Sequence, residues 1–225
     1  MSRTRIALIS ATPAAIGPAT SALAAEFPAA DVWNLLDDKL LADADERGGL
    51  GDDLAERMRR LIDHAVAGGA DGILLTCSMY GPVARERDLE LPVLAPDEAA
   101  FDELLGYRTI LVIASLESAM HDAVARLSAF LKPDATVRGV VSPEAFEATK
   151  SGDPDRLAAL LAATARDHAA GTDAIFLAQY SLAPATTVVA DATGVPVIAG
   201  PVSAAIRLRE TLLEVAGPGD VANYP

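Results

Sequence analysis

The segment Gly69-Ala70-Asp71-Gly72-Ile73-Leu74-Leu75 decides the fold, because a similar segment returns 102 residues later as Gly171-Thr172-Asp173-Ala174-Ile175-Phe176-Leu177. Each copy runs into consecutive apolar residues, which is typical of a strand buried on both faces of a parallel sheet. A duplicated α/β unit explains this better than unrelated units of similar size. Two further pairs keep nearly the same spacing: Leu91-Pro92-Val93 with Val195-Pro196-Val197 at 104 residues, and Arg5 to Thr12 with Arg108 to Ser115 at 103.

Short apolar runs alternate with helical patterns along the whole chain. Asp52 to Ala67, for example, carries Leu54, Met58 and Leu61 on one apolar stripe and stops at Gly68-Gly69. This alternation predicts an α/β fold with mainly parallel sheets flanked by helices. The expected strands are Ile6–Ile9, Asp31–Leu35, Ile73–Cys77, Pro92–Leu94, Ile110–Ala114, Thr136–Val141, Ala174–Ala178 and Pro196–Ala199.

The repeat predicts two half-domains related by a pseudo-twofold axis, with an active-site cleft between them. The first half-domain is expected over residues 1–100 and the second over 101–200. The C-terminal segment 201–225, with a helix over Val202 to Val215, is expected to complete the first half-domain.

Composition excludes several classes of function. The 225 residues carry a net charge of −14 and only 4% aromatic residues, which argues against nucleic-acid or anionic membrane surfaces. One cysteine excludes a disulfide framework and a cysteine-based zinc site, and it fits a cytoplasmic protein. No stretch has the length of a membrane span, no histidines have metal-ligand spacing, and no glycine-rich phosphate loop follows a strand. We therefore expect no metal and no cofactor.

The expected strand ends are rich in small hydroxyl side chains and contain no lysine or arginine. Ligands of parallel sheets bind beyond the carboxyl ends of the strands, and hydroxyls with backbone N–H groups bind carboxylates without a cation. Helix capping is the alternative role for each of these side chains. The candidate substrate-binding residues at these ends are Ser10, Thr12, Ser78, Ser115, Ser181, Pro201 and Ser203.

The loop Leu74-Leu75-Thr76-Cys77-Ser78, together with Ala11-Thr12, resembles the first cysteine loop of the aspartate/glutamate racemase superfamily. Phe176-Leu177-Ala178-Gln179-Tyr180-Ser181 lies where that superfamily usually has its second cysteine loop. The superfamily includes amino-acid racemases, hydantoin racemases, maleate isomerases and arylmalonate decarboxylases. The resemblance implies chemistry at a carbon next to a carboxylate or carbonyl, without metal or cofactor.

The sequence departs from that pattern at one position that matters for mechanism. Cys77 is the only cysteine, and Gln179 occupies the opposing place. A glutamine amide does not titrate near neutrality, so a two-thiol racemization is in doubt. Cys77 is expected to have a lowered pKa, and it could protonate a carbanion or add to an alkene. Gln179 would donate a hydrogen bond to a carboxylate or oxyanion. A buried inert thiol and a polar filler are the alternatives.

The remaining candidates are weaker. Asp37 lines the cleft or is a solvated turn carboxylate, and Tyr80 and Tyr180 are packing or cleft-wall residues. His121 is a minor catalytic candidate, whereas His64 and His168 fit the ends of helices.

These residues together indicate an isomerase or decarboxylase-like lyase acting on a small carboxylate, of unspecified identity. The alternative is a non-catalytic carboxylate-binding or regulatory protein on the same scaffold. Self-association into a homo-oligomer is left open.

Overall fold

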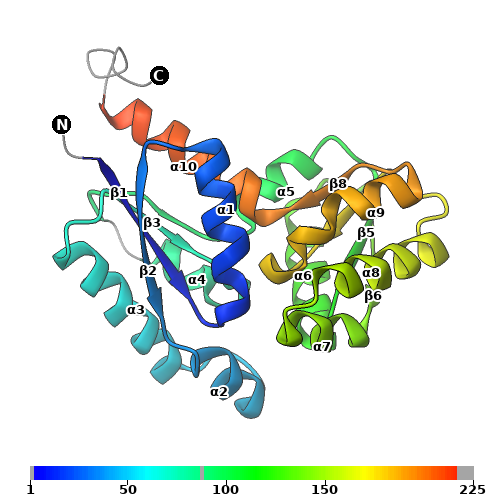
Figure 1. Ribbon diagram of the computed structural model, residues 1–225, viewed down its shortest axis with the longest axis horizontal. Helices are drawn as coiled ribbons and strands as arrows, with labels where there is room; N and C mark the ends of the chain where they lie inside the picture. The colour runs from blue at the N-terminus through cyan, green and yellow to red at the C-terminus, as the bar shows by residue number, and fades with distance from the viewer. Residues whose placement is uncertain (1–2, 87–88, 217–225) are drawn as a thin grey trace. The chain divides into compact units, whose positions relative to one another are not determined.

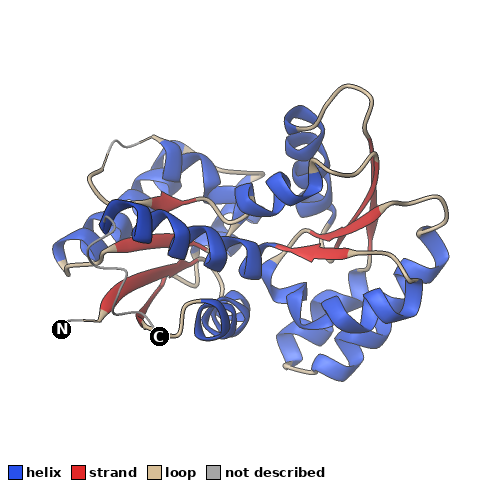
Figure 2. Ribbon diagram, turned by 90° about the horizontal axis from the view of Figure 1, so that it is seen from above, coloured by secondary structure: helices blue, strands red, loops and turns tan. Residues whose placement is uncertain are grey.

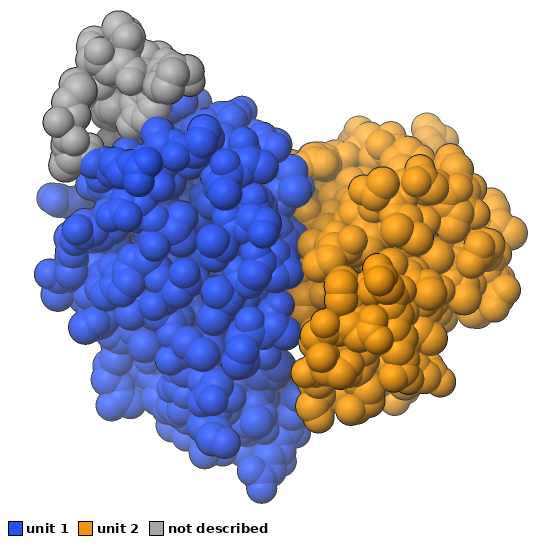
Figure 3. Space-filling model, in the orientation of Figure 1, with its two compact units in different colours: residues 1–96, 201–225 blue, residues 97–200 orange. Residues whose placement is uncertain are grey.

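The chain divides into two compact units in the computed structural model, which describes residues 3–86 and 89–216. Unit 1 comprises residues 1–96 and 201–225, and unit 2 comprises residues 97–200 (Figure 3). Each unit contains a four-stranded parallel sheet with helices on both faces (Figure 2). The expected α/β class is therefore confirmed, and each expected strand is found within two residues at either end.

Unit 1 has the strand order β2-β1-β3-β4 (Figure 1). One face of its sheet carries Ala7, Ile9 and Ile73 and packs against the apolar stripe of α3. The other face carries Ile6 and Gly72, and the leucines of α10 approach it at Gly72. Its elements are β1 (Thr4–Ser10), η1 (Pro13–Ala15), α1 (Ile16–Glu26), β2 (Ala30–Leu36), α2 (Leu40–Arg47), α3 (Asp52–Ala67), β3 (Gly72–Leu75), η2 (Ser78–Tyr80), α4 (Gly81–Arg85), β4 (Val93–Leu94) and α10 (Gly200–Ala216).

Unit 2 repeats this arrangement with the strand order β6-β5-β7-β8. Alternate residues of β5 point to opposite faces, so Leu111 and Ile113 join one core cluster while Ile110 and Val112 join the other. Its elements are α5 (Glu98–Leu104), β5 (Thr109–Ala114), α6 (Glu117–Phe130), β6 (Thr136–Val141), α7 (Pro143–Ser151), α8 (Pro154–His168), β7 (Ala174–Leu177), η3 (Tyr180–Ala185), α9 (Thr186–Thr193) and β8 (Val197–Ala199).

The strand register corrects the expected alignment of the first strands. Ile6 pairs with Gly72 in unit 1, and Ile110 pairs with Ala174 in unit 2. β1 and β5 therefore correspond at a spacing of 104 residues, not 103, while β3 and β7 correspond at 102. The match of Arg5 with Arg108 had favoured a spacing of 103. That spacing is wrong by one residue, and a slip of one residue turns every side chain of a strand to the opposite face of the sheet.

The boundary between the two compact units lies close to residue 100. It falls between residues 96 and 97, just before α5 begins at Glu98. Phe101 of α5 packs edge-on against Phe176 of β7, with ring centroids 5.6 Å apart. The C-terminal helix groups with unit 1, where Arg209 donates to the carbonyl of Glu26 at 2.6 Å.

The close packing of β6 against α6 generates a stability prediction. A Cβ added at Gly139 would collide with the Met120 side chain and lie 2.9 Å from Val124 Cγ2. We expect Gly139→Ala to lower the free energy of unfolding by about 1–3 kcal/mol through overpacking. Urea denaturation measures this loss. The Gly139→Ala/Met120→Ala double variant should lose less than the sum of the two single losses, and strict additivity would contradict the collision.

Candidate functional site

The carboxyl ends of β1 and β3 bring Ser10, Thr76 and Cys77 to one edge of the unit 1 sheet. The Thr76 N–H donates to the Ile9 carbonyl at 3.0 Å, which extends the register of the two strands. The Thr76 hydroxyl donates to Ser10 Oγ at 2.8 Å, and both side chains are buried. Ser10 has no exposed surface, so it does not fit the expected role as a substrate ligand. Its contact with Thr76 joins the two strand ends instead.

Cys77 follows this pair directly. It is half-buried, forms no disulfide, and has the extended backbone of a residue that precedes a helical turn. The Tyr80 N–H closes that turn on the Cys77 carbonyl at 3.1 Å. The thiol is therefore carried by a short, hydrogen-bonded turn at the strand end, and β3 ends at Leu75, two residues earlier than the expected strand end at Cys77.

Gln179 occupies the matching place in unit 2. It has the same extended backbone, and the Leu182 N–H closes the following turn on its carbonyl at 3.0 Å. Its Oε1 accepts hydrogen bonds from the Ser115 N–H at 2.7 Å and the Ser115 hydroxyl at 3.0 Å. A backbone N–H can only donate, so the amide oxygen must face Ser115 and the amide nitrogen must face away.

This orientation leaves the Gln179 NH₂ group as a donor with no hydrogen-bond partner among residues 3–86 and 89–216. Ser115 is buried, and its proton is used on Gln179. Its position supports an orienting role for Ser115, in place of the direct substrate contact expected from the sequence.

The other expected substrate-binding residues fall into two groups, one partly exposed and one buried. Thr12, Ser78 and Ser181 are half-buried at or just beyond strand ends and keep accessible surface. Ser203 and Pro201 are buried in the first turn of α10. Tyr180 is also buried, and its burial raises the pKa of its hydroxyl well above the ordinary value, with nearby Asp97 adding to the shift. Tyr180 is therefore not a neutral-pH acid.

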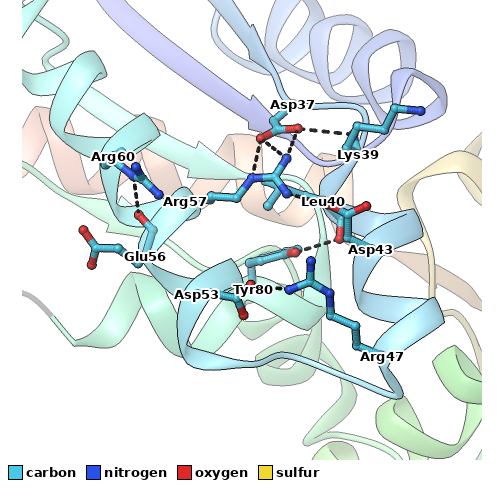
Figure 4. A network of polar contacts seen from close by, with 10 residues as sticks. All are labelled: Asp37, Lys39, Leu40, Asp43, Arg47, Asp53, Glu56, Arg57, Arg60 and Tyr80. Carbon is cyan, nitrogen blue, oxygen red and sulfur yellow. Dashed lines mark hydrogen bonds and ion pairs between the residues drawn. The ribbon is translucent and has the colours of Figure 1, made fainter.

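Asp37 and Tyr80 are engaged within unit 1 (Figure 4). The Asp37 carboxylate accepts from Arg57 Nη2 at 2.7 Å and from Arg57 Nε at 3.1 Å. Tyr80 has no exposed surface, and its hydroxyl donates to the Leu40 carbonyl at 2.8 Å. Tyr80 is thus a core residue, in agreement with the packing interpretation and not with direct substrate contact.

Arg57 was missed by the sequence analysis. It lies three residues after Leu54 and four before Leu61, beside the apolar stripe of α3. The sequence did offer one indication: Arg57 lies beside the apolar positions of α3, and a cation at the edge of a core needs a carboxylate partner.

The three histidines are surface residues. His64, His121 and His168 are all exposed, and the His64 ring lies 5.4 Å from the Trp33 ring. Within the part of the chain that the structure describes, no three His, Cys, Asp or Glu side chains gather where they could hold a metal ion. Over the same residues, none of the helices is both long and apolar enough to cross a membrane.

Comparison with solved structures identifies the fold. Glutamate racemase from Thermus thermophilus, solved with β-chloro-D-alanine, has a TM-score of 0.72 and 16% identity, covering 96% of this chain and 84% of its own. Aspartate racemase from Picrophilus torridus has a TM-score of 0.70 and 14% identity, covering 93% and 94%. Allantoin racemase from Pseudomonas fluorescens has a TM-score of 0.68 and 18% identity, covering 94% and 92%.

At the level of sequence, no family model and no curated protein matches the chain. The resemblance drawn from the cysteine loop is confirmed at the level of structure, because these neighbours span nearly the whole chain. The protein has the fold of the aspartate/glutamate/hydantoin racemase superfamily, with two α/β half-domains.

The buried hydroxyl pair at the β1 and β3 ends generates a second stability prediction. Thr76→Val keeps the shape but removes the donor to Ser10, so we expect a loss of about 1–3 kcal/mol of unfolding free energy. In the Thr76→Val/Ser10→Ala double variant the buried Ser10 hydroxyl, which has lost its donor, is removed as well, so part of the lost stability should be recovered. Urea denaturation measures both, with exposed Thr187→Val as the control. A double variant as unstable as the sum of the singles would contradict this account.

Proposed function

We propose that the protein is a cofactor-independent enzyme that acts on the carbon next to a carboxylate of a small acid. Cys77 is its acid, base or nucleophile, and Gln179 binds the carboxylate or the developing oxyanion. The orientation of the Gln179 amide is the observation that carries the proposal. Ser115 holds the oxygen through two hydrogen bonds, and the remaining NH₂ group can only donate. A fixed donor is what an anionic transition state requires.

The proposal needs Cys77 and Gln179 to reach the same substrate. Their equivalent places after the third strand of each unit support this, as does the racemase fold. Ligands of parallel sheets bind at these strand ends, where Thr12, Ser78 and Ser181 also offer partly exposed hydroxyls to a carboxylate.

A single thiol favours an isomerase or lyase over a two-base racemase. A racemase of the two-base kind needs a titratable group on each face of the carbon, and Gln179 cannot supply one. After loss of carbon dioxide from a malonate-like acid, the Cys77 thiol would protonate the resulting carbanion on one face. Alternatively, the thiolate would add to an alkene, allow rotation about the former double bond, and leave again.

A non-catalytic carboxylate-binding protein is the competing function. The same Gln179 donor favours it, since binding an anion needs no titratable group. The two functions separate by turnover: a binding protein retains small carboxylates without changing them.

The first functional test is a screen followed by substitution. Small dicarboxylates, amino acids and 2-substituted malonates are incubated with the protein in deuterated water and followed by proton NMR. With the substrate so found, Cys77→Ala should lower kcat by about 10²–10⁴. Cys77→Ser should restore little, because a hydroxyl is far less acidic than a thiol.

Gln179 is tested with a matched pair of substitutions. Gln179→Ala should cost about 10²-fold in kcat. Gln179→Glu keeps an acceptor for Ser115 but presents a second anionic oxygen to the substrate, so it should cost more than Gln179→Ala. A Gln179→Glu variant as active as the natural protein, or a Cys77→Ala variant at full rate, would falsify the assigned roles.

The Gln179→Cys variant tests the missing second thiol. If Gln179 stands where a second base would act, this variant should exchange the α-proton from both faces. Racemization in deuterated water, absent in the natural protein, is the expected result. The Gln179→Ser variant is the control, because it has similar size but no titratable thiol. Equal exchange by the cysteine and serine variants argues against the assigned position.

A further inference from the structure

Tyr80 joins the turn that carries Cys77 to the start of α2. It lies three residues after Cys77, and its N–H closes the turn on the Cys77 carbonyl. Its hydroxyl crosses to the Leu40 carbonyl at 2.8 Å, a contact 40 residues away in sequence. The side chain is completely buried, so its only polar atom is committed to this one bond.

The start of α2 is itself held by Arg57 of α3 (Figure 4). Arg57 forms a fork on Asp37, which precedes α2, and donates from Nη1 to Asp43 within α2 at 2.5 Å. The Asp37 carboxylate also accepts from the Lys39 N–H at 3.2 Å. The two carboxylates flank Leu40 in sequence, so Arg57 fixes the peptide whose carbonyl receives the Tyr80 hydroxyl.

Unit 2 shows what the fold alone requires at these places. The backbone bonds match: Leu40 N–H to Asp37 O in unit 1 corresponds to Ala145 N–H to Ser142 O in unit 2, and Tyr80 corresponds to Leu182. Leu182 is buried against Ala145 and Ala148 of α7 in one apolar cluster. Apolar packing is therefore sufficient to join this turn to its helix.

At these equivalent places, unit 1 has the hydroxyl contact and the arginine fork, and unit 2 has neither. At the position of Asp37, unit 2 has Ser142, whose hydroxyl accepts from Thr164 at 3.1 Å with no ion pair. In unit 1 the polar contacts are therefore additional, because apolar packing alone joins the corresponding turn and helix in unit 2.

We propose that Tyr80 is a positioning residue for Cys77: its hydroxyl ties the cysteine-bearing turn to α2, and Arg57 holds α2 in register through Asp37 and Asp43. This inference deepens the proposed function and rests on it, because positioning matters only if Cys77 reacts. Tyr80 does not contact substrate in this account.

The Tyr80 hydroxyl keeps its proton, so its hydrogen bond to the Leu40 carbonyl does not depend on pH near neutrality. Burial raises the pKa of its hydroxyl far above the ordinary value, and the nearby Cys77 raises it further. The hydroxyl therefore stays protonated and donating throughout the range in which a thiol titrates.

Alkylation of Cys77 by iodoacetamide tests the proposal without a known substrate. The protein has one cysteine, so intact mass reports its rate alone. The rate is followed from neutral to alkaline pH for the natural protein and for Tyr80→Phe, which keeps the ring. In Tyr80→Phe we expect the limiting alkylation rate at high pH to rise roughly three- to tenfold. Without the hydrogen bond, the turn opens more often and exposes the half-buried Cys77 thiol to the reagent.

A second variant separates positioning from general loosening. Arg57→Lys keeps the charge but loses the fork, and it should raise the limiting rate in the same direction. Since Arg57 acts through Tyr80, the Tyr80→Phe/Arg57→Lys double variant should be no faster than Tyr80→Phe. Asp53→Asn, which breaks the exposed Arg47–Asp53 pair near the same helices, should leave the rate within about twofold.

Unchanged alkylation in both Tyr80→Phe and Arg57→Lys, with normal unfolding midpoints, would overturn the positioning role. So would rates that add in the double variant. Failure of the proposed function has a different signature: the alkylation rates would respond as expected, while Cys77→Ala would change no activity.

Discussion

The hydrogen-bond register between the first and third strand of each sheet is the constraint on which the rest of the structure depends. Parallel pairing of β1 with β3 and of β5 with β7 brings two strand ends to the same edge in each unit. The bonds continue past the strands, from Thr76 to Ile9 and from Ala178 to Ile113. Cys77 and Gln179 are the residues that follow, so their places are consequences of strand pairing.

The two units share one backbone plan and differ in the polar chemistry at those strand ends. In unit 1 the side chains of Ser10 and Thr76 are paired directly before Cys77, and the turn beyond is bound to α2 through the Tyr80 hydroxyl. In unit 2 the hydroxyl of Ser115 serves the Gln179 amide, and the turn is held by leucine packing. The two units thus share a backbone frame, and they differ in carrying a thiol at the strand end of one unit and an oriented glutamine amide at the strand end of the other.

Two arginines of this protein each bridge a pair of carboxylates. Arg57 bridges Asp37 and Asp43 beside β2 and α2, and the two carboxylates raise the pKa of its guanidinium. Arg126 bridges Asp97 and Asp122 in unit 2, where burial raises the pKa of Asp97 against the opposing effect of Arg126. Such half-buried forks restrict geometry more than they add stability.

The fold class, the eight strands, the amphipathic helix α3 and the equivalent places of Cys77 and Gln179 in the two units were predictable from the sequence. Each rests on local signals: consecutive apolar residues for buried strands, a 3.6-residue stripe for the helix, and a repeat of constant length. The register of β1 against β5 was not predictable to one residue, because matching arginines at an exposed position outweighed the face that each apolar side chain must occupy. Backbone pairing settles that question.

By itself, the sequence determined that one thiol and one glutamine occupy equivalent strand ends of a duplicated α/β chain, since spacing along the chain is a property of sequence alone. Only the tertiary structure decided which hydroxyls are committed inside and which remain accessible. Ser10 bonds with Thr76, 66 residues away, and Ser115 bonds with Gln179, 64 residues away. Asp37, Arg57 and Tyr80 are likewise joined through contacts distant in sequence. The physical reason is that a hydrogen-bond partner is chosen by distance in space, which no local pattern of residues encodes.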